Sequence, residues 1–323
     1  DGERPRLGGG ALAADLVEPQ DGLWLLMLDA NVFYRLDGLW QVRSNAAWNH
    51  VLAQRPYILD WIADVSERAQ QMGKTLLAFS HYPALPLAMT VESGLPVAAC
   101  TPDWLKRMPL LQSGRALAKA GMRRHFSGHM HVAGRVELDG LINIAVPSPV
   151  AYPGGYVVVT GDRGNIDCEF VRLKNAPGFD TAFPAYRAQL RSAEMPDPCH
   201  EALAAADYES FLRAHQRGII AAKNIPKDWP PELQEHLDTP LAQLSDGVPC
   251  LAGALRFRPD MAKLRLGQLL EDYYFIRSGG EETIRALPEG RIAFYRHLGT
   301  AAQASGKTNQ PFARMAVLLA ALL

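Results

Sequence analysis

The sequence predicts an α/β domain over residues 1–174, followed by a mostly helical domain over 175–323. Short apolar runs alternate with a helical pattern as far as residue 127, which is typical of buried strands joined by helices. Residues 135–173 instead alternate between turn signals, as antiparallel strands do. The final third shows helical periodicity broken by Pro and Gly. With 323 residues, 48% of them hydrophobic, the chain is long enough for two domains.

The first predicted strands are short apolar runs that end at turn residues. Residues 1–20 are Gly-rich and weakly patterned, so we interpret them as a loop or edge segment. The runs over 23–28 and 75–80 are typical of strands covered on both faces. A helix is predicted between them over 55–73, because apolar residues recur there at helical spacing and Gly73 stands where a helix would stop.

Residues 84–112 are rich in Pro and show no regular pattern. A loop of this length in a compact domain is usually functional, so we expect it to border a ligand-binding cleft. A short helix over 113–122 and a third buried strand over 124–127 follow. Turn signals such as Asp-Gly and Pro-Gly-Gly then separate four expected antiparallel strands, over 135–138, 140–146, 155–160 and 165–173.

The second domain is predicted from two apolar stripes. Residues 266–274 place apolar side chains at i, i+3, i+4, i+7 and i+8, and 208–215 show a similar stripe. The apolar terminus, 315–323, is far too short to span a bilayer, so we expect a buried helix there.

Composition excludes several classes of protein. A net charge of −1 argues against a general nucleic-acid or membrane-surface binder, which needs a basic excess. Four scattered Cys residues without C-x-x-C spacing exclude a disulfide scaffold and a zinc knuckle. One disulfide stays open if the protein is exported; the compartment is undetermined, with the cytoplasm favoured. Because the chain opens on Asp1 without a signal-peptide pattern, we expect it to be part of a larger, processed or partial product.

Histidines follow two of the predicted strands. The run F-S-H-Y-P over 79–83 contains His81, and F-S-G-H-M-H over 126–131 contains His129 and His131. Ligands bind at this edge of open α/β sheets, and neutral imidazole suits Zn, Mn and Fe. In an extended chain the second and third histidines point the same way. We therefore expect all three rings to converge, with nitrogens within roughly 5 Å of a common centre.

These runs resemble the last two metal motifs of the calcineurin-like metallophosphoesterase family, and residues 21–174 resemble the second half of that domain. The resemblance implies a four-layer αββα sandwich of two β-sheets between helices, with its C-terminal half present here. It implies a dinuclear centre of divalent or trivalent Mn, Fe or Zn, with His81 and His129 on one ion and His131 on the other. The implied activity is hydrolysis of a phosphomonoester or phosphodiester, in a small-molecule or nucleotide substrate, by a metal-bridging hydroxide.

The earlier motifs of that family, D-x-H, G-D-x-x-D and G-N-H-[DE], do not occur in this sequence. G-D-R-G-N over 161–165 ends in Asn and lies downstream of the histidines, and W-N-H-V over 48–51 lacks the flanking Gly and acid. Three imidazoles without a bridging carboxylate do not hold two close dications, which repel one another. No catalytic residue is therefore identifiable in the chain. We expect the missing half upstream in the same protein, and this chain alone to be incomplete as an enzyme.

Three further interpretations stay open. His125 would share a face with His129 and His131 in an extended strand, so contact with substrate or with the metal ligands is an alternative to a purely structural role. The chain could be a catalytically inactive binding module with the metallophosphoesterase fold. The three metal-motif histidines could instead hold a lone structural zinc.

Overall fold

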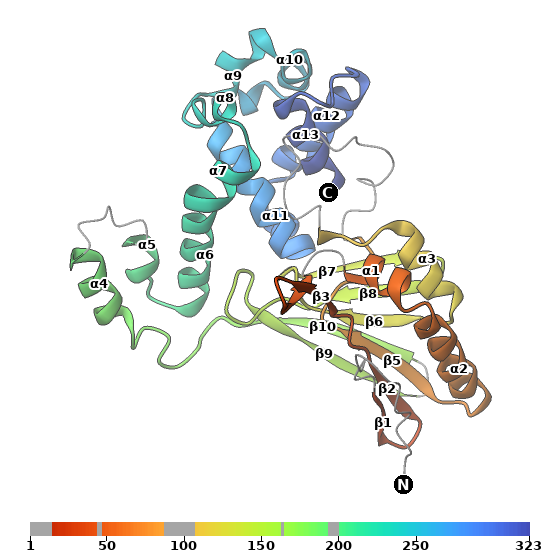
Figure 1. Ribbon diagram of the computed structural model, residues 1–323. Coiled ribbons are helices and arrows are strands. Elements are labelled where there is room, and N and C mark those ends of the chain that lie inside the picture. The colour runs from red at the N-terminus through yellow and green to blue at the C-terminus, as the bar shows by residue number, and fades with distance from the viewer. Residues whose placement is uncertain (1–14, 44–46, 87–106, 163–164, 193–199) are drawn as a thin grey trace.

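The computed structural model describes residues 15–43, 47–86, 107–162, 165–192 and 200–323. It shows a mixed six-stranded sheet with helices against one face, followed by a helical part (Figure 1). The mixed α/β class predicted from the sequence is confirmed. Most of the Pro-rich segment, residues 87–106, lies outside the described residues, so its predicted place beside a cleft stays a prediction.

Four parallel strands form the centre of the sheet, and an antiparallel strand lies at each edge. In spatial order the strands are β1 (Asp15–Gln20), β2 (Leu23–Met27), β5 (Thr75–Ser80), β6 (Arg124–Ser127), β8 (Leu141–Ala145) and β7 (Gly134–Leu138). Strand β1 pairs antiparallel with β2, and β7 with β8. The edge segment expected within 1–20 is thus partly a strand, and the buried runs predicted at 75–80 and 124–127 form strands with those bounds.

The four strands predicted over 135–173 form two antiparallel hairpins, as expected, but the two hairpins do not join in one antiparallel sheet. Strand β8 pairs parallel with β6, so the β7–β8 hairpin extends the central sheet. Strands β9 (Gly155–Asp162) and β10 (Asn165–Arg172) form a separate two-stranded hairpin. Alternation of apolar and polar residues indicates that a strand exists, but burial of its side chains determines which strand it pairs with. Leu141 and Ala145 of β8 are almost fully buried, which requires that β8 lie inside the sheet.

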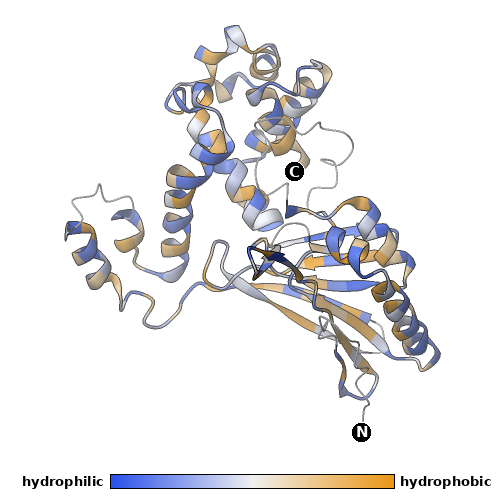
Figure 2. Cartoon of the chain, viewed as in Figure 1, coloured by the Kyte–Doolittle hydropathy of each residue, from blue (hydrophilic) through white to orange (hydrophobic). Residues whose placement is uncertain are grey.

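The two faces of the sheet are covered differently. Helices α1 (Ala47–Gln54), α2 (Tyr57–Gln71) and α3 (Leu111–Lys119) lie on one face, and the β9–β10 hairpin lies against the other (Figure 1). Successive side chains alternate between the faces: Leu26 packs in the core with the helices, and Leu25 packs in the core with the hairpin. Figure 2 shows the resulting concentration of hydrophobic residues along the central strands.

Sequence reasoning missed helix α1 and a small hairpin, β3 (Val32–Leu36) and β4 (Leu39–Arg43). The hairpin turns at Asp37 and Gly38, which both have positive φ (50° and 79°). Asp-Gly between two short runs is a strong hairpin signal, so this element could have been predicted. Helix α1 is short, and it is held through Trp48, which is fully buried.

The remaining helices form the second part of the chain. They are α4 (Phe183–Ser192), α5 (His200–Leu203), α6 (Tyr208–Ile219), a π-helical turn (Ile220–Asn224), α7 (Ile225–Asp228), α8 (Pro231–Gln234), α9 (Leu241–Leu244), α10 (Pro249–Phe257), α11 (Leu266–Ala286), α12 (Glu289–Ala304) and α13 (Pro311–Ala321). The stripe predicted over 266–274 is fully buried, and 315–319 are buried in α13, which confirms the buried terminal helix. Among the described residues, no helix is both long and apolar enough to cross a membrane.

Helix α11 lies against the sheet part at the segment that follows the second histidine motif. The backbone N–H of Ala133 donates to the carbonyl of Ser278 (3.0 Å), and the hydroxyls of Tyr152 and Thr283 are 2.8 Å apart. Gly280 has φ 52°, and a Cβ built there would lie 2.3 Å from the carbonyl oxygen of Ala133. The close backbone approach at this point therefore requires glycine.

Candidate metal centre

The parallel strands β2, β5 and β6 end at one edge of the sheet, where Asp29, His81 and Gly128 follow them. The N–H of Gly128 donates to the carbonyl of His81 (3.0 Å), which holds the second motif against the first. An open cavity of about 550 Å³ lies at this edge, and its polar side chains include Asp29, Ser80 and His81. The carboxyl edge predicted to bind a ligand is therefore hollow and partly polar.

His81 and His129 are brought into contact. The Nδ1 atom of His129 lies 3.2 Å from Nε2 of His81, and the ring centroids are 5.1 Å apart at an interplanar angle of 75°. Two imidazole nitrogens bound at ~2.1 Å to one ion, with an angle of ~90–110° between them, are about 3.0–3.4 Å apart. The observed distance suits two neighbouring ligands of one ion. It also suits an N–H···N hydrogen bond, which a metal ion would replace.

The backbone of the second motif is not extended, which overturns the reason given for expecting its histidines to point the same way. Strand β6 ends at Ser127, and both His129 (φ 61°) and His131 (φ 51°) have left-handed backbone. Between them, the N–H of Met130 donates to the carbonyl of Gly128 (2.7 Å) and closes a tight turn. Left-handed non-glycine residues cost on the order of 1–3 kcal/mol each and cluster at functional sites.

His131 does not take part in the contact between His81 and His129. Within the described ranges, no three His, Cys, Asp or Glu side chains are grouped so that they could hold one metal ion. Partial burial lowers the pKa of His131, and electrostatic interactions with His81, Arg277 and Arg107 lower it further. The structure thus places His131 within electrostatic range of His81, Arg277 and Arg107, while His129 makes the direct contact with His81.

His125 is fully buried behind this edge. Its Nδ1 lies 2.8 Å from Oδ1 of Asn143, which also accepts a hydrogen bond from the N–H of Ala84 (2.9 Å). Nδ1 therefore carries the proton, which leaves Nε2 as an acceptor 2.9 Å from Oγ of Ser80. The same hydroxyl lies 2.8 Å from the carbonyl oxygen of Tyr82, so its one proton serves these two acceptors. Burial lowers the pKa of His125 to about 4, so the ring stays neutral. His125 thereby holds Ser80, the residue that precedes His81. Ser80 lines the cavity, whereas His125 does not.

Two further groups at this edge were not predicted as site residues. Asp29 lines the cavity, and its Oδ1 accepts from both nitrogens of Asn31 (2.8 and 2.6 Å). Burial raises the pKa of Tyr82, and the nearby charge of Asp29 raises it further; the Tyr82 ring also packs on that of His129 (4.5 Å between centroids). An acid directly after a buried strand is the signal that could have identified Asp29.

Arg107 and Arg277 could not have been found from local sequence. Arg277 belongs to helix α11, and its neighbour Ser278 accepts the bond from Ala133, two residues beyond His131. Its guanidinium lies over the ring of Tyr274 (5.7 Å). Burial lowers the pKa of Arg277, and the positive charge of Arg107 also lowers it. Two arginines whose positive charges act on one another and on His131 favour an anion in their vicinity.

The two sequence segments that nearly match the absent motifs occupy other places. Oδ1 of Asn49 accepts from the N–H of Leu110 (2.8 Å) and from Oγ of Ser113 (2.7 Å), so it fixes the start of α3. Residues 161–165 span the turn of the β9–β10 hairpin, with 163–164 outside the described residues. The chain matches no protein-family model and no curated protein.

Proposed function

We propose that this chain is part of a metal-dependent hydrolase of phosphate esters, a metallophosphoesterase. In this proposal His81 and His129 bind one ion of a dinuclear Mn, Fe or Zn centre, and His131 binds the other. One observation carries the proposal: the ring nitrogens of His81 and His129, 3.2 Å apart at the carboxyl edge of a parallel sheet. Neutral imidazoles at this spacing form the donor set that such ions prefer.

The proposed architecture is one half of a four-layer αββα sandwich. Its support is the uneven covering of the sheet, with helices on one face and only the β9–β10 hairpin on the other. The cavity on that second face is largely apolar, and Met27 and Val159 on its walls are 43% and 37% exposed. A second sheet packed on this face would bury these side chains and complete the sandwich.

The chain's own residues have distinct parts in the proposed chemistry. Bound ions supply Lewis-acid activation of water and of the phosphoryl group. His81 and His129 hold and orient one of these ions, and the buried Ser80–His125 network keeps the loop of His81 in place. Arg107 and Arg277 provide positive charge beside His131 that suits the oxygens of an anionic ester.

The proposal is tested by the metal content of the purified full chain after incubation with manganese or zinc. His81→Ala and His129→Ala should each lower bound metal at least tenfold, because each removes one of two neighbouring ligands. His236→Ala removes an exposed histidine from the helical part and should leave the metal content unchanged. Equal metal content in all four proteins would contradict the proposal.

A catalytically inactive binding module with the same fold is the second candidate. The absence of the D-x-H, G-D-x-x-D and G-N-H-[DE] motifs from the sequence favours it. The two candidates differ in a protein that joins this chain to a segment carrying those motifs. A metal-loaded protein of that kind that binds phosphodiesters without hydrolysing them would support the binding module.

A further inference from the structure

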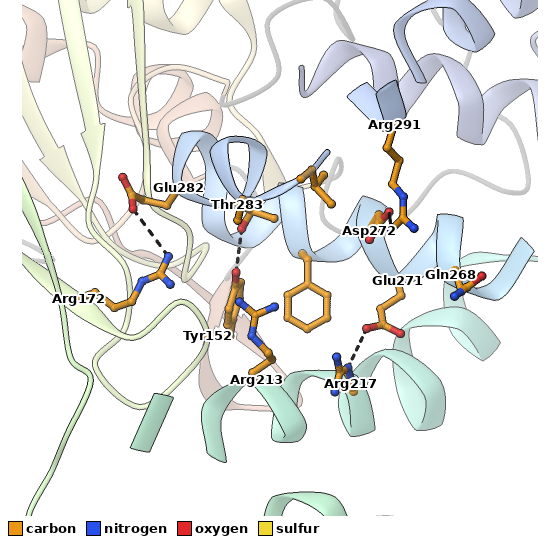
Figure 3. A pocket seen from close by; sticks show the side chains of 13 residues that line it. Tyr152, Arg172, Arg213, Arg217, Gln268, Glu271, Asp272, Glu282, Thr283 and Arg291 are labelled. Carbon is orange, nitrogen blue, oxygen red and sulfur yellow. Dashed lines mark hydrogen bonds and ion pairs between the residues drawn. The ribbon is translucent and has the colours of Figure 1, made fainter. Parts of the chain in front are cut away.

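A second cavity lies away from the histidine edge, between the segment that carries Tyr152 and helices α6, α11 and α12 (Figure 3). Its volume is about 340 Å³, within the range of sites for small organic molecules. Four arginines and three acids line it, together with the apolar side chains of Phe275, Ala286 and Leu287. Thr283 of α11 contacts the hydroxyl of Tyr152 (2.8 Å), so the wall joins the sheet part to the helices.

Most charges on this wall neutralise one another. Each of its three acidic side chains lies next to an arginine, as the dashed lines in Figure 3 show for two of them. The pairs are Arg172 with Glu282 (3.8 Å), Arg217 with Glu271 (2.8 Å) and Arg291 with Asp272 (2.9 Å). Asp272 also accepts a hydrogen bond from the hydroxyl of Tyr295 (2.6 Å). These groups hold the wall together and leave little net charge of their own.

Arg213 is the exception. Its guanidinium carbon lies 5.5 Å from the ring centroids of both Tyr152 and Phe275, so two aromatic faces hold it. Among the residues that the structure describes, no carboxylate pairs with it and no acceptor receives its hydrogen bonds. An arginine stacked on aromatic faces keeps the N–H groups at its edge available, five donors in a rigid fork.

The acidic residues near Arg213 do not accept hydrogen bonds from its guanidinium either. On its other side it borders a hollow of about 350 Å³ that contains Asp207 and Glu209. Asp207 accepts from the N–H of Ser210 (2.7 Å), and Glu209 pairs with Arg172 (2.7 Å). Both acids are thus engaged elsewhere, and the guanidinium is left as a preorganised donor on the cavity wall.

We propose that this cavity binds a small organic oxyanion, a carboxylate or phosphate with an apolar body. The oxyanion accepts two parallel hydrogen bonds from Arg213, which is the geometry that guanidinium and oxyanion groups favour. The apolar body packs against Phe275 and Leu287 on the same wall. The nearby acids are already paired with arginines, so they attract cations less than free carboxylates would, and they give no second anion site.

The test is a calorimetric titration of the full chain with phenylphosphonate and with benzoate, in the presence of a chelator. The chelator removes metal ions, so metal-dependent binding at the histidine edge does not contribute, and the Arg213 substitutions identify the binding that belongs to this cavity. Binding by both probes, and none by benzamidine, a cation of similar size, is the expected result. The ratio of the affinities for phenylphosphonate and benzoate shows whether the site prefers phosphate or carboxylate ligands. Inorganic phosphate and acetate lack the ring, so their weaker binding measures what the apolar body contributes to affinity.

Two substitutions of Arg213 and one control substitution locate the site. Arg213→Gln should weaken binding of the preferred probe at least about tenfold, and Arg213→Lys should restore part of it by keeping charge without the fork. Arg256→Gln, on the exposed side of α10, should bind as the unmodified chain does. Thermal unfolding without ligand checks that each variant is folded. No binding of either oxyanion at about 10 mM, or equal binding by folded Arg213→Gln, would overturn the inference.

Discussion

The Nδ1 atom of His129 lies 3.2 Å from the Nε2 atom of His81, although 48 positions separate the two residues in the chain. Parallel pairing of β5 with β6 aligns Ser80 with Ser127, so the residues that follow each strand meet at one edge. The pairing accounts for their proximity, and the left-handed turn at His129 accounts for the direction of its ring.

If both rings hold one ion, their contributions to metal affinity are coupled. His81→Ala and His129→Ala should each weaken binding by ten- to a hundredfold, and the double substitution should weaken it by much less than the product. Titration with cobalt or zinc for all four proteins measures this. Additive losses would show that the two histidines bind independently.

Gly280→Ala should destabilise the chain by at least about 2 kcal/mol, because it adds a clash to an unfavourable backbone conformation. Gly280 has φ 52°, and its added Cβ would meet the carbonyl oxygen of Ala133 at 2.3 Å. Gly306→Ala is the matched control, since Gly306 also has positive φ (65°) but has open space around it. Its cost should be about 1 kcal/mol. Equal unfolding midpoints in urea for the two variants would contradict the close contact between α11 and residue 133.

The buried His125 should make stability depend on pH. The pKa of His125 is lowered from 6.5 in the unfolded chain to about 4 in the folded chain. Between pH 4 and 6.5, His125 therefore binds a proton in the unfolded chain but not in the folded chain. Its contribution to stability is therefore fully present above pH 6.5 and is lost as the pH falls toward 4. The full shift corresponds to about 3 kcal/mol.

Urea unfolding at several pH values between 4 and 8 tests this contribution. His125→Gln should lower stability at pH 8, because it disturbs the bonds to Ser80 and Asn143, and should show a smaller loss on acidification. His236→Gln, at an exposed position, should keep the dependence of the unmodified chain. Parallel curves for His125→Gln and the unmodified chain would rule out the buried neutral ring.

Residues 1–323 alone should hydrolyse phosphoesters poorly. Two ions need about eight to twelve ligand positions, and three histidines are the recognisable ligands in the sequence. Turnover of an aryl phosphodiester with added manganese measures this. Robust turnover that a chelator abolishes would reveal ligands elsewhere in the chain. In a protein that also contains the absent motifs, His131→Ala should lower activity by orders of magnitude with little effect on folding.

The sequence by itself determined the elements whose pattern is local. Apolar runs identified the strands that precede both histidine motifs, and helical spacing identified the buried stripe over 266–274. These predictions depend only on residues a few positions apart, because side-chain periodicity follows from the backbone geometry of one element. The positions of His81, His129 and His131 at the ends of strands were visible for the same reason.

Tertiary structure decided which elements meet. The parallel pairing of β8 with β6, the contact between His81 and His129, and the hydrogen bond from Ala133 to Ser278 all join distant segments. Local alternation is the same for a strand in a separate hairpin and for one in the central sheet, so it does not reveal the partner. Burial of apolar faces determines which strands pair, and that burial depends on the packing of the whole folded chain.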